Sequence, residues 1–327
     1  MKTKITVLLT GCLLFELTGF GQQTWNEPKA KLTIQVKDEN NAPVDAATVR
    51  MAFTVKNTHQ QDMMTGKTDV SGIFVGEGYS DGVLDADVRK DGYYISGSGT
   101  SFKAATNGNW IPWNSTVTTI LRPIGKPVEL YVKAVQADIP VLGKPCGYDL
   151  EAGDWVTPYG KGMKKDLIFV ITQKEVKGQG DFNVQGELTF ENPLDGLQQT
   201  SIPEIGKNSA FKWERQAPEN GYQSKFPLQF TWWKSLGQKP IRSFKFGNNK
   251  WDGYFFRVHT VEQDGKIVSA HYGKIRDGIV IEPRGTPTCT IIFTYYFNPT
   301  PNDRNLEWDT KKNLFSGLTN LETPREP

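Results

Sequence analysis

Short segments in which apolar and polar residues alternate, separated by clusters of turn-forming residues, recur along almost the whole chain. Residues 31–37 read Lys-Leu-Thr-Ile-Gln-Val-Lys, and residues 83–89 read Val-Leu-Asp-Ala-Asp-Val-Arg. Because side chains on a strand point alternately to its two faces, each segment predicts a strand with one buried and one solvent-facing side. Turn-forming residues follow at 38–43 and 90–92. This spacing predicts an all-β chain whose first part is a β-sandwich.

The second half repeats this organisation over a longer stretch. It contains no amphipathic pattern longer than a few helical turns and no internal repeat. We therefore expect a larger antiparallel β-domain, either a sandwich or jelly-roll-like. Its strands are expected at 128–135, 167–172, 182–190, 226–232, 243–246, 254–261, 266–272, 279–282 and 290–297.

Four motifs in the first part resemble a known family. They read Leu-Thr-Ile-Gln-Val-Lys-Asp at 32–38, Ala-Pro-Val-Asp-Ala-Ala-Thr-Val at 42–49, Thr-Asp-Val-Ser-Gly-Ile-Phe at 68–74 and Val-Arg-Lys-Asp-Gly-Tyr at 88–93. They make residues 29–122 similar to the carboxypeptidase regulatory-like (transthyretin-like) β-sandwich, although the segment 96–115 departs from its pattern. The resemblance implies an immunoglobulin-like or transthyretin-like fold with an accessory role, and it brings no active site to this chain.

The length of 327 residues suits two domains. The Pro- and Gly-containing segment 123–127 is expected to link the first domain to a second at 128–315. The remaining polar tail, 316–327, is expected to fray.

The N-terminus has the pattern of a secretory signal peptide. Lys2 and Lys4 precede an apolar run at 5–15, and small residues near Gly21 predict removal of residues 1–21. The apolar run is too short to span a bilayer, and no later segment is apolar enough, so we expect no transmembrane segment. Cys12 stands in a sequence that resembles a bacterial lipobox, and lipoprotein anchoring is the alternative to simple export into the periplasm, onto the cell surface or into the medium.

Charge and cysteine content exclude several classes of partner and cofactor. The formal net charge is +2 without a basic stripe, which argues against nucleic acid as a partner. Cys146 and Cys289 remain once the signal peptide is removed. An exported compartment permits a disulfide between them, and two separate buried thiols are the alternative. Neither has a partner at metal-ligand spacing, so no metal site and no cofactor is expected.

His259 and His271 flank the turn signal Asp264-Gly265. A two-residue Asp-Gly loop places His271 opposite Val258 and His259 opposite Ala270, which puts the two imidazoles on opposite faces of the hairpin. A loop one residue longer would place them directly opposite each other. The Asp-Gly signal favours the first register and therefore two ordinary strand histidines.

The segment 147–162 is the most motif-like loop. It concentrates three carboxylates, Asp149, Glu151 and Asp154, with aromatic residues at Tyr148, Trp155 and Tyr159. Aromatic rings stack on sugars, and two carboxylates at suitable separation hydrolyse glycosidic bonds, so the loop is a candidate for either activity. The alternative is a structural loop whose aromatic rings close the end of the sandwich and whose acids are solvated.

Trp110 and Trp113 form a second candidate glycan-binding platform, in the segment that departs from the family pattern. No nucleophile motif is present. The sequence therefore favours an exported non-catalytic β-sandwich protein that binds a polysaccharide or an envelope protein, or is structural. The alternative is a carbohydrate-active enzyme that uses the carboxylates of the 147–162 loop.

Overall fold

The computed structural model describes residues 27–55, 61–177, 181–233, 241–244, 252–283 and 288–327. Strands make up 56% of the chain and pair into several antiparallel sheets, which confirms the all-β, β-sandwich prediction. The described ranges contain no α-helix and only one short 3-10 helix, η1 (Glu204–Gly206). The predicted signal peptide at 1–21, with Cys12, lies outside the described residues.

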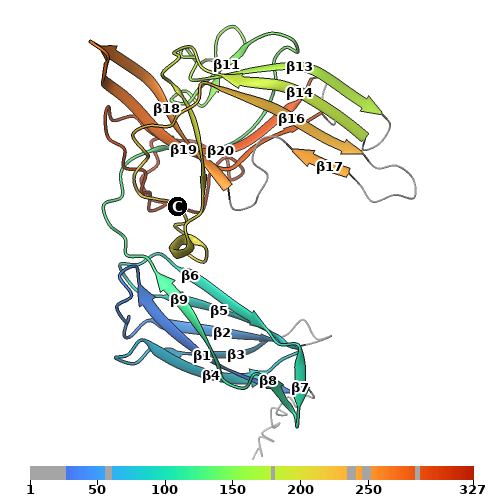
Figure 1. The fold of residues 1–327 in the computed structure, drawn as a ribbon, viewed down its shortest axis with the longest axis vertical. Helices are drawn as coiled ribbons and strands as arrows, with labels where there is room; N and C mark the ends of the chain where they lie inside the picture. The colour runs from blue at the N-terminus through green and yellow to red at the C-terminus, as the bar shows by residue number, and fades with distance from the viewer. Residues whose placement is uncertain (1–26, 56–60, 178–180, 234–240, 245–251, 284–287) are drawn as a thin grey trace, which may run out of the picture.

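Two sheets form the N-terminal sandwich, the lower part of Figure 1. The first sheet contains β1 (Lys29–Asp38), β4 (Ile73–Tyr79), β7 (Ala104–Thr106), β8 (Asn109–Ile111) and β9 (Ser115–Leu121). The second contains β2 (Thr48–Thr54), β3 (Gln61–Lys67), β5 (Val83–Arg89) and β6 (Ser96–Ser101). The segment 96–115, which departs from the family pattern, thus supplies strands to both sheets.

The apolar residues that alternate with polar ones along the strands form the N-terminal core. Leu32, Ile34 and Val36 of β1 are fully buried, as predicted, and pack with inward residues of β2 and β5 from the facing sheet. The backbone hydrogen-bonding groups of β1 are satisfied on both sides, because β1 pairs antiparallel with β4 and parallel with β9. Burying a large aliphatic side chain contributes about 1.5–3 kcal/mol, so such rows provide most of the driving force for this sandwich.

Two larger sheets form the C-terminal sandwich. The first runs in the order β10 (Tyr131–Asp138), β20 (Thr290–Asn298), β19 (Lys266–Glu282), β18 (Asp252–Gln263) and β15 (Gly196–Ser201). The second runs β12 (Asp154–Trp155), β11 (Cys146–Asp149), β13 (Leu167–Lys177), β14 (Asp181–Thr189), β16 (Lys225–Trp233) and β17 (Ile241–Phe244).

One long strand, β19, replaces the two strands expected at 266–272 and 279–282. Its pairing with β20 shifts register between Arg276 and Val280, where Asp277 and Gly278 both adopt positive φ. Such an irregularity lets one strand bend without ending. The gap expected between the two strands is therefore a bulge inside a continuous strand.

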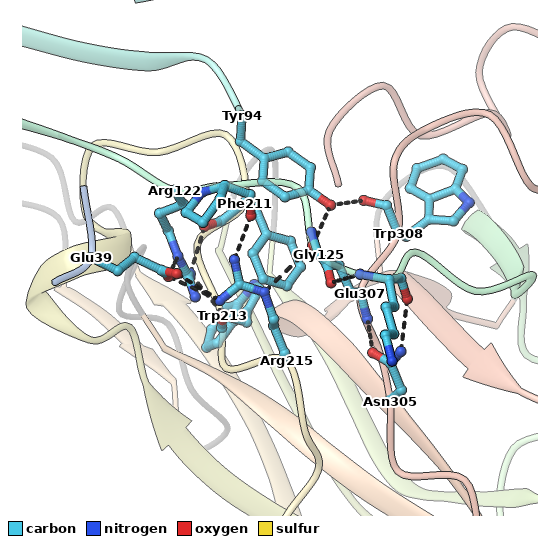
Figure 2. A network of polar contacts seen from close by, with 12 residues as sticks. Glu39, Tyr94, Arg122, Gly125, Phe211, Trp213, Arg215, Asn305, Glu307 and Trp308 are labelled. Atoms are coloured by element: carbon cyan, nitrogen blue, oxygen red, sulfur yellow. Dashed lines mark hydrogen bonds and ion pairs between the residues drawn. The ribbon is translucent and has the colours of Figure 1, made fainter. Parts of the chain in front are cut away.

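A polar junction joins the two sandwiches (Figure 2). The carboxylate of Glu39, from the first sandwich, accepts hydrogen bonds from Arg122 Nε at 2.6 Å and from Arg215 at 2.9 Å. The Arg122 guanidinium also donates to the carbonyl oxygens of Phe211 and Trp213, both at 2.8 Å. Bonds of this charge-assisted kind are roughly twice as strong as neutral ones, and they bring distant parts of the chain into one arrangement.

A second carboxylate holds the segment that connects the sandwiches. Glu307 is almost fully buried and accepts the backbone N–H groups of Gly125 at 2.8 Å and Lys126 at 2.9 Å. The hydroxyl of Tyr94, in the first sandwich, donates to the same carboxylate at 3.1 Å (Figure 2). Residues 123–127, expected as a linker, are thus tied to the second sandwich.

The C-terminal tail is also held, which corrects the expectation that it frays. Lys133 forms an ion pair with Glu322 at 3.0 Å, and Arg276 forms one with Glu326 at 2.9 Å. The Tyr296 hydroxyl donates to the carbonyl oxygen of Glu326 at 2.7 Å. A polar composition indicated solvent exposure but not these partners, which lie on β10, β19 and β20.

Candidate functional site

The three carboxylates predicted in the 147–162 loop maintain the shape of that loop. Asp149 is buried and accepts backbone N–H groups from four residues, Glu151, Ala152, Met163 and Lys164, at 2.8–3.0 Å. Burial alone would raise its pKa, but these four hydrogen bonds outweigh burial and hold the pKa of Asp149 below its usual range. A carboxylate fixed in its ionised form cannot act as the general acid of a glycosidase.

The other two acids are also engaged. Glu151 accepts a hydrogen bond from the Lys164 ammonium at 2.7 Å. Asp154 accepts the backbone N–H groups of Trp155 at 2.8 Å and Lys161 at 3.1 Å. The loop is therefore a compact structural turn, as in the alternative interpretation of the sequence. That interpretation expected solvated acids, whereas Asp149 is buried.

Two of the three aromatic residues of the loop are in the core. Tyr148 and Trp155 are buried, and their rings pack edge to face at 5.4 Å between centroids. Tyr148 also packs against Phe293 of the opposite sheet. This corrects the expectation that both rings stack on a glycan, because rings that close a hydrophobic core offer no face to a sugar. Tyr159 is 45% exposed, the only one of the three loop aromatics at the surface.

Trp110 and Trp113 do not form a flat platform either. Trp110 is half-buried, stacks on Phe102 and donates its indole N–H to the Ser80 carbonyl at 2.8 Å. Trp113 is 40% exposed, with the Lys31 ammonium 5.8 Å above its ring. Trp110 therefore has a structural role, and Trp113 is the single exposed ring of the predicted pair.

Cys146 and Cys289 are two free, buried thiols, so the disulfide that an oxidising compartment would permit is not formed. Burial raises the pKa of both, for Cys289 to about 11. Both side chains belong to the core of the C-terminal sandwich, and a protonated thiol packs there as a small apolar group. The second of the two alternatives left open by the sequence is the correct one.

The two histidines lie together, which corrects the prediction that the hairpin separates them. The Asp264-Gly265 loop and the pairing of Val258 with His271 are as predicted. Between Val258 and Val261, however, two residues on β18 face one on β19, and His259 has φ +55°. This β-bulge turns the His259 side chain to the face of His271, and the ring centroids lie 5.0 Å apart.

Two buried aspartates hold this bulge. Asp195 accepts the backbone N–H groups of His259 at 3.1 Å and Thr260 at 3.0 Å. Asp166 lies 2.6 Å from His259 Nε2. The sequence carries no local signal for either contact, because Asp166 and Asp195 come from loops far from the hairpin.

The pKa values of the two histidines are shifted in opposite directions. Burial alone would lower the pKa of His259, but the hydrogen bond and charge of Asp166 raise it. Burial, together with the neighbouring charge of His259, lowers the pKa of His271. Glu151 and Lys164 add smaller effects of opposite sign on both imidazoles. Perturbed pKa values of this kind occur at functional sites and also in structural networks.

A groove with a volume of about 890 Å³ runs along β10, the outermost strand of its sheet. Residues of β10 form one wall, Tyr148 and Asp154 of the predicted loop contribute to another, and tail residues from Thr319 to Glu322 border it. Its volume lies within the range of ordinary ligand sites. No local sequence pattern predicts this groove, because it depends on which strand lies at the edge of a sheet.

Two features are absent from the described residues. No group of three or more His, Cys, Asp or Glu side chains is arranged to hold a metal ion. No helix there is long and apolar enough to span a membrane.

Comparison with known proteins assigns no family to this chain. No protein-family model and no curated protein matches this chain. One similar solved structure is 3-chlorocatechol 1,2-dioxygenase from Rhodococcus opacus, with 9% identity and a TM-score of 0.27 over 32% of this chain. That match spans 63% of the dioxygenase, less than two thirds of its length.

Two further structures are similar over 81% of this chain. A Bacteroides uniformis protein, whose proposed role is carbohydrate binding, has 11% identity and a TM-score of 0.19 over 96% of its own length. BcpA, the major pilin subunit of Bacillus cereus, has 10% identity and a TM-score of 0.22 over 95% of its length. At these values the similarities assign no activity to this chain.

Proposed function

We propose that this chain is an exported, non-catalytic binding protein of the cell envelope whose ligand occupies the groove along β10. The observation that carries the proposal is the groove itself, with a volume of about 890 Å³ and polar and charged side chains on its walls. The predicted signal peptide supports export. The accessory role implied for residues 29–122 by their resemblance to the carboxypeptidase regulatory-like sandwich agrees with binding as the activity.

The state of the loop carboxylates argues against the enzymatic alternative. A glycosidase needs one acid that holds a proton and a second carboxylate free to attack or to activate water. Asp149 is kept ionised by backbone hydrogen bonds, and Asp154 is occupied by the N–H groups of its own loop. Binding without turnover therefore fits this loop better than hydrolysis does.

The burial of the predicted aromatic residues favours a protein ligand over a glycan. Sugar-binding surfaces present aromatic faces in groups. Here the exposed rings Trp113 and Tyr159 belong to different sandwiches, and the ring in the groove, Tyr148, is almost fully buried. The groove instead offers main-chain groups of an edge strand, which recognise extended peptides.

The test compares envelope binding of two tryptophan variants. Ala134→Trp places an indole in the groove, and Ala105→Trp places one on exposed β7 of the other sandwich as the matched control. Purified chain is sedimented with envelope fragments of the source organism and, separately, with insoluble polysaccharides. We expect Ala134→Trp to lose retention and Ala105→Trp to keep it, with thermal unfolding verifying that both fold. Equal retention of the two variants, or release of soluble sugars from the polysaccharides, contradicts the proposal.

A further inference from the structure

The edge of β10 is already partly covered by later parts of the chain, at residues 312–313 and at Glu322 of the tail. The N–H groups of Leu130 and Ala134 donate to the carbonyl oxygens of Lys312 and Glu322, at 3.2 and 2.9 Å. Between them, the N–H of Val132 donates to the Asn313 side chain at 3.1 Å. These residues are two apart, so the outward-facing groups of β10 belong to its even-numbered residues. The partners are a single isolated bridge between Leu130 and Asn313 and a turn at 319–323, so the backbone groups of this edge are open to pairing from outside the sheet.

The cover stops at Glu322, and β10 continues. The next outward groups are the N–H and C=O of Gln136 and the N–H of Asp138, since both residues follow in the same period. None of these groups has a hydrogen-bond partner within the described part of the chain. They face the groove, whose lining includes both residues. A row of unpaired donors and acceptors beside a groove is a template for an additional strand.

The charge of the groove determines which kind of extended segment it favours. Three carboxylates line it, those of Asp138, Asp154 and Glu322, against one ammonium, that of Lys133. Lys133 is already bound to Glu322 at 3.0 Å and to the Gly153 carbonyl oxygen at 2.9 Å. Hydrogen bonds from Thr319 and Lys133 lower the pKa of Glu322 to about 2, so Glu322 is ionised and balances the charge of Lys133. The excess negative charge of the lining comes from Asp138 and Asp154. Its complement is a positively charged side chain.

We propose that an extended segment of a partner protein, bearing Lys or Arg, pairs with β10 at Gln136–Asp138, beyond the last internal bond of this edge, from Ala134 to Glu322. This inference rests on the proposed function, because it names the partner of the same groove. Main-chain bonds to Gln136 and Asp138 supply affinity, and the carboxylates of the groove supply the preference for basic side chains.

The test removes a single backbone donor. Gln136→Pro eliminates the outward N–H, and Pro is tolerated on an edge strand where that N–H faces away from the sheet. Gln136→Ala is the matched control, because it removes the exposed side chain and keeps the N–H. The probe is a fluorescent ten-residue peptide in which Lys and Thr alternate with Val, and its binding is followed by fluorescence polarisation.

We expect Gln136→Pro to weaken binding of the Lys peptide about tenfold, the loss of one backbone hydrogen bond. Gln136→Ala should stay within about twofold of the unsubstituted chain. A peptide with Glu in place of Lys should bind more weakly, and Asp138→Asn should reduce this difference. No binding of the Lys peptide, equal binding of the two Gln136 variants, or equal binding of the Lys and Glu peptides overturns the inference.

Two controls separate the ways in which the experiment can fail. Alternate N-methylation of the peptide removes its own N–H groups and tests strand pairing even if Gln136→Pro does not fold. Light scattering without peptide detects self-association, and a dimer abolished by Gln136→Pro would make a second copy the occupant and refute a foreign partner. If envelope binding is lost in Ala134→Trp but unaffected by Gln136→Pro, the proposed function stands and strand pairing fails.

Discussion

Replacing Lys274 with Met is expected to stabilise the protein, because this lysine is buried without a partner. Its Nζ has no hydrogen bond in the described part of the chain and lies 4.5 Å from the ring centroid of Tyr296 and 4.9 Å from that of Phe211. Burial first, and then the charges of Arg276 and Arg122, lower its pKa from 10.5 to about 7. Cation–π contacts recover only part of the lost hydration.

The magnitude follows from this shift in pKa. A difference of one pKa unit corresponds to about 1.4 kcal/mol, so the fall from 10.5 to about 7 corresponds to a cost of about 5 kcal/mol for holding the ammonium in the folded state. The full cost applies below pH 7, where Lys274 is charged in both states. Between pH 7 and 10.5 the unfolded chain binds more protons than the folded one, so stability rises with pH. Above pH 10.5 the amine is neutral in both states and the cost disappears.

Denaturant unfolding at pH 6 and pH 10 measures this effect. Lys274→Met should raise the free energy of unfolding by several kcal/mol at pH 6, and most of this gain should vanish by pH 10. Lys266→Met, on an exposed position of the same strand, is the matched control and should change stability by less than about 0.5 kcal/mol at both pH values. A gain at pH 6 that matches the control, or one that is unchanged at pH 10, would show that Lys274 is not a buried, unpaired amine.

Three further predictions address the junction, the loop and the histidines. Glu307→Gln should destabilise the protein by about 3 kcal/mol in denaturant unfolding, because two backbone N–H groups and Arg215 lose a buried carboxylate, whereas exposed Glu129→Gln should be neutral. Asp149→Asn should cost about 2–3 kcal/mol by the same assay, since the amide replaces one of two oxygens that accept four backbone N–H groups. The pKa of His271 is lower in the folded state than its unfolded value of 6.5, so the protein loses stability as the pH falls below 6.5 and through the folded-state pKa. His271→Gln should reduce this loss in thermal unfolding measured from pH 7 to 5.

Strands with one buried face were predictable from sequence, and strands without one were not. The range 83–89 was predicted as it stands in β5, because Leu84, Ala86 and Val88 alternate with polar residues and all three are buried. By contrast, β3 has no buried residue, so its sequence carries no apolar period. It is a strand because β2 pairs with it, a tertiary interaction that a local pattern cannot reveal.

Tertiary interactions that a local pattern cannot reveal also explain why two of the aromatic rings predicted to stack on a glycan are buried. Aromatic residues in a loop can close a core or contact a ligand, and no periodicity separates the two roles. Tyr148 and Trp155 are buried because β11 and β12 fold the loop back over the open end of the sandwich, so that Tyr148 meets Phe293 of the opposite sheet. The direction of these rings thus depends on a strand more than 130 residues further along the chain.

The histidine pair shows most clearly where reasoning from local sequence ends. The Asp264-Gly265 turn sets the register of the hairpin tip, and that register is the one predicted. That register is not kept along the whole hairpin: Val261 pairs with Ser269, and the bulge at His259 and Thr260 restores the pairing of Val258 with His271. Within this bulge His259 has a left-handed backbone conformation, which is costly for a non-glycine residue. Asp195 offsets this cost by accepting the two backbone N–H groups that the bulge exposes, and Asp166 binds the imidazole that it redirects. A short turn can therefore determine which backbone positions pair near the tip of a hairpin. Buried acceptors from distant loops determine which side chains come into contact further along it.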